Sequence, residues 1–228
     1  MALGVSPIPF TLVVYILGVA AIIMIFLWNI HFRGGFAWNT SHKPLIFNIH
    51  PVLLLIGPII IGGEAIISYK SLRLKKEIKK VIHLVLHGIA LLLGIIGIYT
   101  AFKFHNESGI KNLYSLHSWL GIGVIVLYGI QWLFGFVMFF YPGLKSSLRS
   151  KTLPWHALFG LVVYALAVGN ASLGFLEKLT FLENSGLAKN GTEALLVNFT
   201  AMITILYGVF VVISAISSPT GADDYAPI

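Results

Sequence analysis

Six long segments of this chain are almost free of charged residues, and each is long enough to cross a membrane as a helix. A spanning helix needs about 20 apolar residues. Hydrophobic residues make up 57% of the 228-residue chain and charged residues only 10%, a balance that a soluble domain of this size does not have. We therefore expect an all-α polytopic membrane protein. The segments cover roughly residues 8–30, 46–69, 81–103, 115–140, 154–176 and 195–217.

Little of the chain remains outside these segments, so we expect one domain over residues 1–228 and no soluble catalytic module. The first segment lacks a basic start, and its apolar run is longer than that of a signal peptide, which indicates a retained helix. The chain has no cysteine. Disulfides, thiolate-bound zinc, iron–sulfur clusters and covalently attached haem are therefore excluded.

The net charge of +7 is concentrated in two of the connections between segments. By the positive-inside rule, these two connections and both termini are expected to face the cytoplasm. The basic run is short, lies next to the membrane and lacks the context of a nucleic-acid-binding motif, so no nucleic-acid partner is expected. Its residues are Lys70, Arg73, Lys75, Lys76, Lys79 and Lys80 before the third segment, and Lys145, Arg149 and Lys151 before the fifth.

Four histidines, one in each of the second to fifth segments, lie where helices are expected to begin: His50, His83, His117 and His156. An ionisable residue at membrane depth is costly and usually has a functional reason. Consecutive spanning helices run in opposite directions. His50 and His117 are therefore expected at the non-cytoplasmic face, and His83 and His156 at the cytoplasmic face.

Signals for helix starts place these histidines at similar shallow depths. Asn48 is expected to cap the helix of His50, and Ser115 that of His117. Pro154 is expected in the first turn of the helix that carries His156. The two pairs would then lie about 20 Å apart, given a rise of 1.5 Å per residue.

Two imidazole pairs at opposite faces suit two haems, because two axial imidazoles saturate haem iron and favour electron transfer over oxygen binding. We therefore expect helices 2–5, over about residues 46–176, to form a four-helix bundle around two b-type haems. The helices at about 8–30 and 195–217 would be peripheral. Trp132 and Phe134 could lie along the route between the haems, but we favour lipid contact or ordinary core packing for them. A zinc or copper site is the competing metal hypothesis, but it needs three or more converging ligands.

Other histidines need separate interpretations. His87 lies one turn beyond His83 on the same helix face, so spacing alone does not choose between them. Depth favours His83 as the ligand and leaves His87 for a hydrogen bond, with a haem propionate as a possible partner. His105 lies at the end of the third segment, next to Asn106 and near Tyr114, where it is a candidate for an outer substrate pocket. A plain interfacial role for His105 is almost as reasonable.

Five short motifs surround these histidines and the glycines of the second segment. They are Phe47-Asn48-Ile49-His50-Pro51, Gly62-Gly63-Glu64-Ala65, Lys80-Val81-Ile82-His83-Leu84-Val85-Leu86-His87, Ser115-Leu116-His117-Ser118-Trp119 and Pro154-Trp155-His156. They resemble those of the cytochrome b-561 family, whose members are six-helix, di-haem proteins that transfer electrons from cytoplasmic ascorbate across a membrane. The resemblance extends over the second to fifth segments and more loosely into the sixth, and the Ser-Leu-His-Ser-Trp string is its most specific part.

The resemblance implies that His50 pairs with His117 and His83 with His156 as axial ligands of two non-covalent haem b groups, with His87 and His105 as non-ligands. It also implies a homodimer. The cytoplasmic ascorbate site implied by the family carries over to four basic residues, which suits a monoanionic substrate. These residues are Arg73, Lys76, Lys80 and Arg149.

The implied non-cytoplasmic site carries over to the region of His105, Asn106 and Tyr114, where monodehydroascorbate or a ferric chelate would accept the electron. The expected activity is thus that of an ascorbate-dependent transmembrane oxidoreductase embedded in a lipid bilayer. Vacuolar, vesicle and plasma membranes all suit this orientation, with a slight preference for the vacuolar membrane. Two alternatives remain: a haem-bearing anchor subunit that exchanges electrons with quinol, and a haem-free transporter or receptor.

Overall fold

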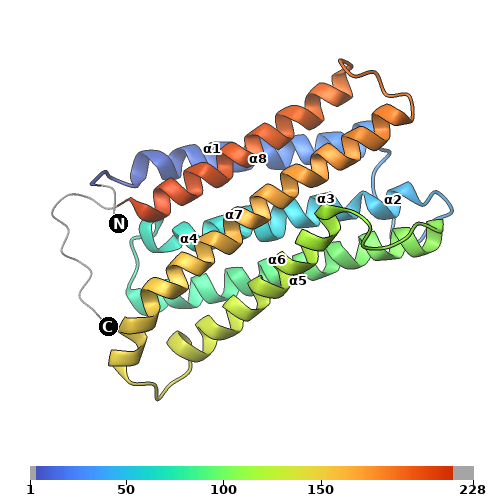
Figure 1. The fold of residues 1–228 in the computed structure, drawn as a ribbon. Coiled ribbons are helices and arrows are strands. Elements are labelled where there is room, and N and C mark those ends of the chain that lie inside the picture. Colours follow the sequence, from blue (N-terminus) through green and yellow to red (C-terminus); the bar gives the residue numbers. More distant parts are fainter. Residues whose placement is uncertain (1–3, 218–228) are drawn as a thin grey trace.

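The computed structural model describes residues 4–217, and its long elements in that range are helices. Six spans within this range are long and apolar enough to cross a membrane, and they lie side by side along one axis (Figure 1). They confirm the predicted all-α polytopic fold. The spans are Ile8–Phe32, Pro44–Ser71, Lys76–Ser108, Leu116–Phe140, Ser146–Asn184 and Thr192–Ile216.

Three of the spans contain a π-helical segment, and the second span is the most interrupted. The third, fifth and sixth spans are continuous helices: α5 (Lys76–Ser108), α7 (Ser146–Asn184) and α8 (Thr192–Ile216). The others are composed of α1 (Ile8–Leu27) and η1 (Trp28–Phe32); α2 (Pro44–Phe47), α3 (Ile49–Leu54), η2 (Leu55–Ile61) and α4 (Gly62–Ser71); and α6 (Leu116–Gly135) and η3 (Phe136–Phe140).

The two ends of the bundle differ in charge. The α4–α5 and η3–α7 connections lie at the same end, where α1 begins and α8 ends (Figure 1). This end carries the two lysine- and arginine-rich connections at residues 70–80 and 145–151, and we call it the basic end. The opposite end, with α2 and the α5–α6 and α7–α8 connections, we call the distal end.

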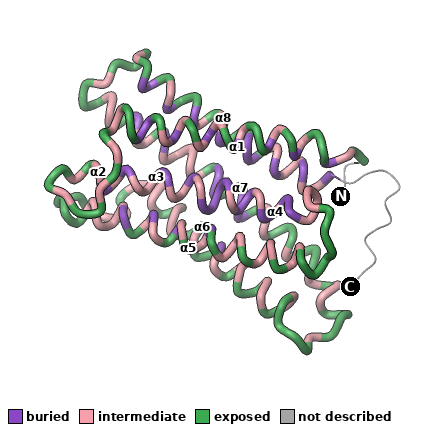
Figure 2. The backbone as a smooth tube through the Cα atoms, turned by 180° about the vertical axis from the view of Figure 1, so that it is seen from behind, coloured by how far each residue is buried: buried purple, intermediate pink, exposed green. Residues whose placement is uncertain are grey.

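The most tightly packed core lies between α1, the second span, α7 and α8 (Figure 2). Val14 and Ile25 of α1 are fully buried there, as are Tyr207 and Val211 of α8. Burial of apolar side chains against neighbouring helices fixes the positions of the outer two spans. α1 and α8 therefore serve packing, which agrees with their lack of paired histidines.

Tyrosine hydroxyls donate hydrogen bonds to backbone carbonyls in the irregular part of the second span. A π-helical turn disturbs the regular ladder of hydrogen bonds, and a free carbonyl at membrane depth is costly. Tyr164 donates to the carbonyl of Ile59 at 3.2 Å, and Tyr207 donates to that of Ile60 at 2.9 Å. A Cβ at Gly63 would lie 2.8 Å from both hydroxyls, so this close approach requires glycine. These contacts fix the direction in which the second span passes its neighbours.

Two helices begin earlier than the sequence analysis predicted. α5 begins at Lys76 and not near residue 81, and α7 begins at Ser146 and not at Pro154, which lies inside the helix. The prediction equated the start of the helix with the start of the apolar segment, whereas polar residues extend both helices. His156 thus lies about 15 Å along α7 from its first residue. The expected position near a helix start is correct for His117, one residue into α6, and for His50, one residue into α3, but not for His83 or His156.

The two predicted helix caps have different outcomes. Ser115 caps α6, and together with Ser118 it forms a capping box. The predicted cap at Asn48 is wrong, because the backbone there is already helical between α2 and α3. Its buried side chain instead donates to the carbonyls of Arg33 and Gly35 at 3.1 and 2.7 Å. Asn48 therefore attaches the connection after η1 to the second span.

Candidate functional site

The structure brings the four histidines together in the two predicted pairs. The ring centres of His50, on α3, and His117, on α6, are 6.1 Å apart. Those of His83, on α5, and His156, on α7, are 6.3 Å apart. Two metal–imidazole bonds of about 2 Å, together with the two ring radii, span about 6 Å. Each pair is thus spaced to hold one metal centre between its rings.

Three of these histidines have the same hydrogen bond on the ring nitrogen Nδ1. The Nδ1 atoms of His50, His83 and His117 each lie 2.9 Å from a backbone carbonyl oxygen, of Gly97, Ala65 and Asn170 respectively. A carbonyl only accepts, so this contact places the ring proton on Nδ1 and leaves the lone pair of Nε2 for a metal. These rings are therefore oriented as metal ligands.

His156 is held by a side chain in place of a carbonyl. Nε2 of Gln131, on α6, donates to the backbone carbonyl of His156 at 2.6 Å and lies 3.0 Å from Nδ1 of the same residue. A Cβ at Gly160 would lie 3.3 Å from this amide nitrogen. Gln131 thus positions both the backbone and the ring of His156. The sequence analysis missed it, although a glutamine at membrane depth is itself a signal.

The carbonyl partners define the spacing between the two pairs. Gly97 follows His83 by fourteen residues on α5, and Asn170 follows His156 by fourteen residues on α7. This interval corresponds to a rise of about 21 Å along each helix. The His83–His156 pair therefore lies toward the basic end and the His50–His117 pair toward the distal end, at the separation that the sequence predicted.

Glycines face two of the paired rings closely. A Cβ at Gly174, on α7, would lie 2.7 Å from Cε1 of His117. A Cβ at Gly135, on α6, would lie 3.0 Å from Cε1 of His156. Any side chain at Gly174 would displace the His117 ring, since real Cβ atoms essentially never approach so closely. The two glycines thus form part of the cradle for the histidine pairs.

A largely apolar cavity of about 480 Å³ extends from the His50–His117 pair toward the distal end. Its lining includes Tyr128 at its inner limit and Lys178 among its few charged groups. The ammonium group of Lys178 lies 4.4 Å from the centre of the Phe47 ring. Such a cavity, with imidazoles at its wall, suits a flat apolar cofactor.

The residues present fit haem iron with two axial imidazoles. The ring spacing, the free Nε2 atoms of His50, His83 and His117, and the glycine cradle all agree with such a group. The competing zinc or copper hypothesis requires three converging ligands. No group of three or more His, Cys, Asp or Glu side chains with that arrangement occurs in residues 4–217. His87 lies beside the inner pair: its ring is 4.5 Å from that of His83, and its Nδ1 is 2.5 Å from the Tyr128 hydroxyl. Its contact with a propionate stays a prediction.

Two of the four predicted basic-end residues contact the chain at the end of the fourth span. The Nζ atom of Lys80 lies 6.0 Å from the centre of the Phe140 ring. Nη2 of Arg149 donates to the carbonyl of the next residue, Tyr141, at 3.5 Å. Arg73 and Lys76 are exposed on and beside the α4–α5 connection. Lys80 of α5 and Arg149 of α7 thus contact adjacent residues, Phe140 and Tyr141, whereas Arg73 and Lys76 are exposed.

At the distal end, two of the three predicted substrate residues line the cavity. His105 and Tyr114 are part of the lining, with ring centres 6.1 Å apart. Asn106 is not in that lining and instead accepts a hydrogen bond from Asn112, which also lies 3.2 Å from Nδ1 of His105. Burial and the charge of Glu177 raise the pKa of Tyr114 above its usual value, so its phenol is neutral at physiological pH.

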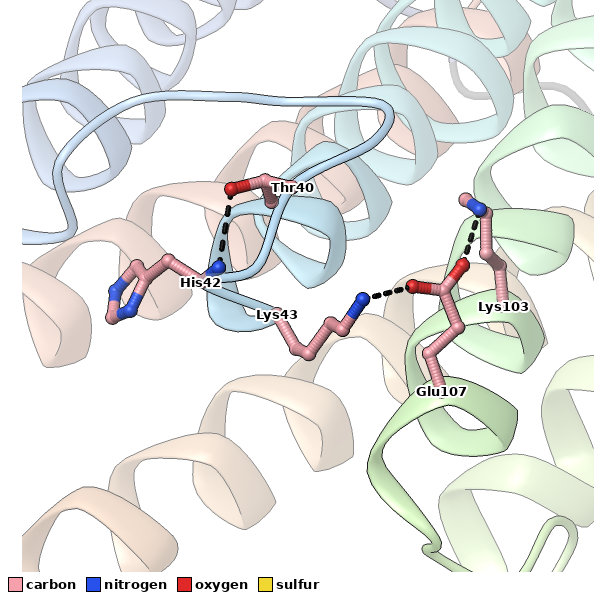
Figure 3. A network of polar contacts seen from close by, with 5 residues as sticks. All are labelled: Thr40, His42, Lys43, Lys103 and Glu107. Carbon is pink, nitrogen blue, oxygen red and sulfur yellow. Dashed lines mark hydrogen bonds and ion pairs between the residues drawn. The ribbon is translucent and has the colours of Figure 1, made fainter.

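The connection before the second span is attached to α5 by a surface ion-pair network (Figure 3). Glu107 pairs with Lys43 from this connection at 2.6 Å and with Lys103 from its own helix. The backbone N–H of His42 bonds to the hydroxyl of Thr40 at 3.1 Å, and the His42 ring points away from the ion pairs. His42 is therefore not part of the candidate site.

Comparisons with known proteins agree with this geometry. A family model described as eukaryotic cytochrome b561 matches residues 49–182. The chain is 64% identical to transmembrane ascorbate ferrireductase 1 of Arabidopsis thaliana, over 94% of this chain and 90% of that protein. It is 61% identical to probable ascorbate-specific transmembrane electron transporter 1 of Oryza sativa subsp. japonica, over 100% and 99%. It is also 38% identical to transmembrane ascorbate-dependent reductase CYB561 of Mus musculus, over 86% and 78%. The chain belongs to the eukaryotic cytochrome b561 family.

Proposed function

We propose that this chain is an oxidoreductase that carries electrons from ascorbate through a membrane. Its relatives are named for ascorbate-dependent reduction and electron transport, and the family implies a haem b cofactor. The observation that supports the proposal best is the presence of two imidazole pairs about 21 Å apart along the same helices. One pair could bind a cofactor at one face of the membrane only, whereas two pairs, one toward each face, provide a path for electrons between the two faces.

Each pair would hold one haem b: His83 with His156 the inner one, and His50 with His117 the outer one. Bound haem would supply one-electron chemistry, and the imidazoles of these four histidines would hold the two groups. The carbonyls of Ala65, Gly97 and Asn170 orient three ligand rings, and Gln131 orients the fourth. The four histidines and the second to fifth spans thus form the cytochrome core, in a single domain that includes α1 and α8.

The basic end is the proposed cytoplasmic donor site, with both termini on the same side by the positive-inside rule. Ascorbate is an anion at neutral pH, and the cationic groups of Lys80 and Arg149 attract it, with Arg73 and Lys76 at the rim. Loss of one electron from ascorbate is accompanied by loss of one proton, which passes to water at this exposed face.

The distal end is the proposed acceptor site. His105 and Tyr114 lie in the wall of the outer cavity, and the neutral phenol of Tyr114 is available to donate a hydrogen bond to an oxygen-rich acceptor. Monodehydroascorbate and ferric chelates both have such oxygens. Asn106 contributes to this site indirectly. It accepts a hydrogen bond from the side chain of Asn112, and Asn112 in turn contacts His105.

We further propose a homodimer in a vacuolar, vesicle or plasma membrane.

Replacement of Lys80 with alanine is expected to raise the ascorbate concentration for half-maximal reduction about tenfold, because one favourable charge near the donor is lost. Haem content should not change, since Lys80 contacts neither histidine pair. The measurement is stopped-flow reduction of the purified protein over a range of ascorbate concentrations.

The matched control is Lys79→Ala, because Lys79 is adjacent but directs its ammonium group to the carbonyl of Tyr69 at 3.0 Å. It should weaken reduction much less than Lys80→Ala does. Equal effects of the two variants would mean that Lys80 acts only through the overall positive charge of the basic end. Wild-type reduction kinetics in Lys80→Ala would show that Lys80 is not part of the donor site. Failure of ascorbate to reduce the wild-type protein would contradict the proposed function itself.

A further inference from the structure

A hydrogen-bonded pair of side chains lies between the two histidine pairs. Nδ1 of His87, on α5, is 2.5 Å from the hydroxyl oxygen of Tyr128, on α6, and the two ring centres are 5.4 Å apart. Tyr128 is only 6% exposed, so this contact is shielded from lipid and water. Neither residue has a role in holding the four ligand rings.

The pair extends from one histidine site to the cavity beside the other. At its inner side, the ring of His87 is in T-shaped contact with that of His83, with centres 4.5 Å apart. At its outer side, Tyr128 lines the cavity whose wall also contains His50 and His117. The contacts therefore run from an inner ligand, through His87 and Tyr128, to the space next to the outer ligands.

The aromatic residues that the sequence suggested as a route do not make this connection. Trp132 donates to the carbonyl of Leu84 at 3.0 Å and stacks on Phe136 with ring centres 6.1 Å apart. Phe134 stacks on His156 at 6.2 Å. Among the described residues that line the outer cavity, neither Trp132 nor Phe134 is present. Both therefore contact only the inner half of the bundle.

We propose that His87 and Tyr128 form the contact bridge through which an electron passes from the inner site to the outer site. The inference rests on the proposed function. The inner site loses one electron and the outer site gains it, while His87 and Tyr128 begin and end the transfer neutral, with no bond made or broken. Electron tunnelling decays less steeply through hydrogen-bonded and packed atoms than through a gap, which favours this route over a path through looser packing.

The test is the rate at which an electron redistributes between the two sites of the purified full-length holoprotein. Photoreduction by a flash, without ascorbate or acceptor, starts the reaction, and the two haem absorption bands report it. Tyr128→Leu is expected to slow redistribution about tenfold, because loss of the ring opens a gap between His87 and the outer cavity. Tyr128→Phe keeps the ring and loses the hydroxyl, so it should slow redistribution about threefold. Trp132→Leu, on the same helix, should leave the rate within about twofold of wild type, since the gap that it opens lies away from the bridge.

Two further readouts separate a bridge from a structural role. The haem content and the two reduction potentials of the Tyr128 variants should equal those of wild type, because a bridge affects only the rate. Wild-type rates in both Tyr128 variants, or equal slowing by Trp132→Leu, would overturn the proposal. If Tyr128→Leu loses a haem, Tyr128→Phe decides: slowing supports the bridge and a wild-type rate refutes it. A wild-type chain with one haem would show no redistribution at all and would defeat the proposed function instead.

Discussion

Replacement of Gly174 with alanine is expected to remove the outer haem while the inner haem stays bound. The new Cβ would lie 2.7 Å from Cε1 of His117 and 3.2 Å from both of its ring nitrogens. Contacts this short force the ring to move, and its Nδ1 then loses the carbonyl of Asn170. Misplacement of one axial ligand leaves His50 without its counterpart. Haem per purified chain, measured by the pyridine haemochrome method, should fall from two to one.

The matched control is Gly169→Ala, because it adds the same methyl group to the same helix. Beyond its two chain neighbours and the nearby backbone of its own helix, a Cβ at Gly169 would have no heavy atom of the described residues within 4 Å, so both haems should remain. Gly135 is the corresponding glycine of the inner pair, because its Cβ would lie 3.0 Å from Cε1 of His156. Gly174→Ala with two haems and wild-type spectra would show that His117 is not held in this position.

Replacement of Glu193 with alanine is expected to lower the stability of the protein by about 3 kcal/mol, the lower part of the range for breaking a buried ion pair. Glu193 is 5% exposed at the start of α8. It pairs with Arg33 and accepts a hydrogen bond of 2.9 Å from Nε1 of Trp28. Its loss leaves the buried indole N–H of Trp28 and the partly buried Arg33 cation without this partner. The measurement is thermal unfolding in detergent.

The ion-pair network of Figure 3 provides the control for Glu193. Glu107 also contacts two basic side chains, Lys43 and Lys103, but its own side chain is 31% exposed. Surface ion pairs contribute at most about 1 kcal/mol. Glu107→Ala should therefore shift the unfolding temperature much less than Glu193→Ala. Similar shifts in the two variants would mean that burial of the Glu193 pair has little effect on stability.

The sequence predicted the six spans and the two histidine pairs because both depend on simple physical limits. Membrane thickness sets the length of an apolar segment, and alternating helix direction sorts His50 and His117 from His83 and His156. The pairing therefore required no knowledge of side-chain contacts. In the structure, the two rings of each predicted pair lie close enough to bind one metal centre between them.

Features that depend on tertiary contacts were not predictable in this way. The start of α7 at Ser146 reflects polar residues that extend a helix beyond the membrane, where hydropathy gives no signal. Asn48 has the residue type of a helix cap, but two carbonyls of the preceding connection compete for its side chain. The role of Tyr128 depends on a partner 41 positions away in the chain, His87, and no local pattern indicates this contact.

The predicted substrate residues show the same division. Lys80 and His105 were suggested by motif and charge, and both lie at cavity or surface positions that suit their proposed roles. Asn106 was suggested by its position next to His105, yet it is outside the cavity lining because adjacent residues on a helix point in different directions. Asn112, from the following connection, contacts His105 in its place.

The number of haems per chain tests the central claim most directly, because it depends on both histidine pairs at once. The purified wild-type protein, quantified by amino-acid analysis and the pyridine haemochrome spectrum, should contain two haem b groups per chain. Both should show the low-spin spectra of iron with two axial imidazoles. A count of one haem per chain, or none, would contradict the account.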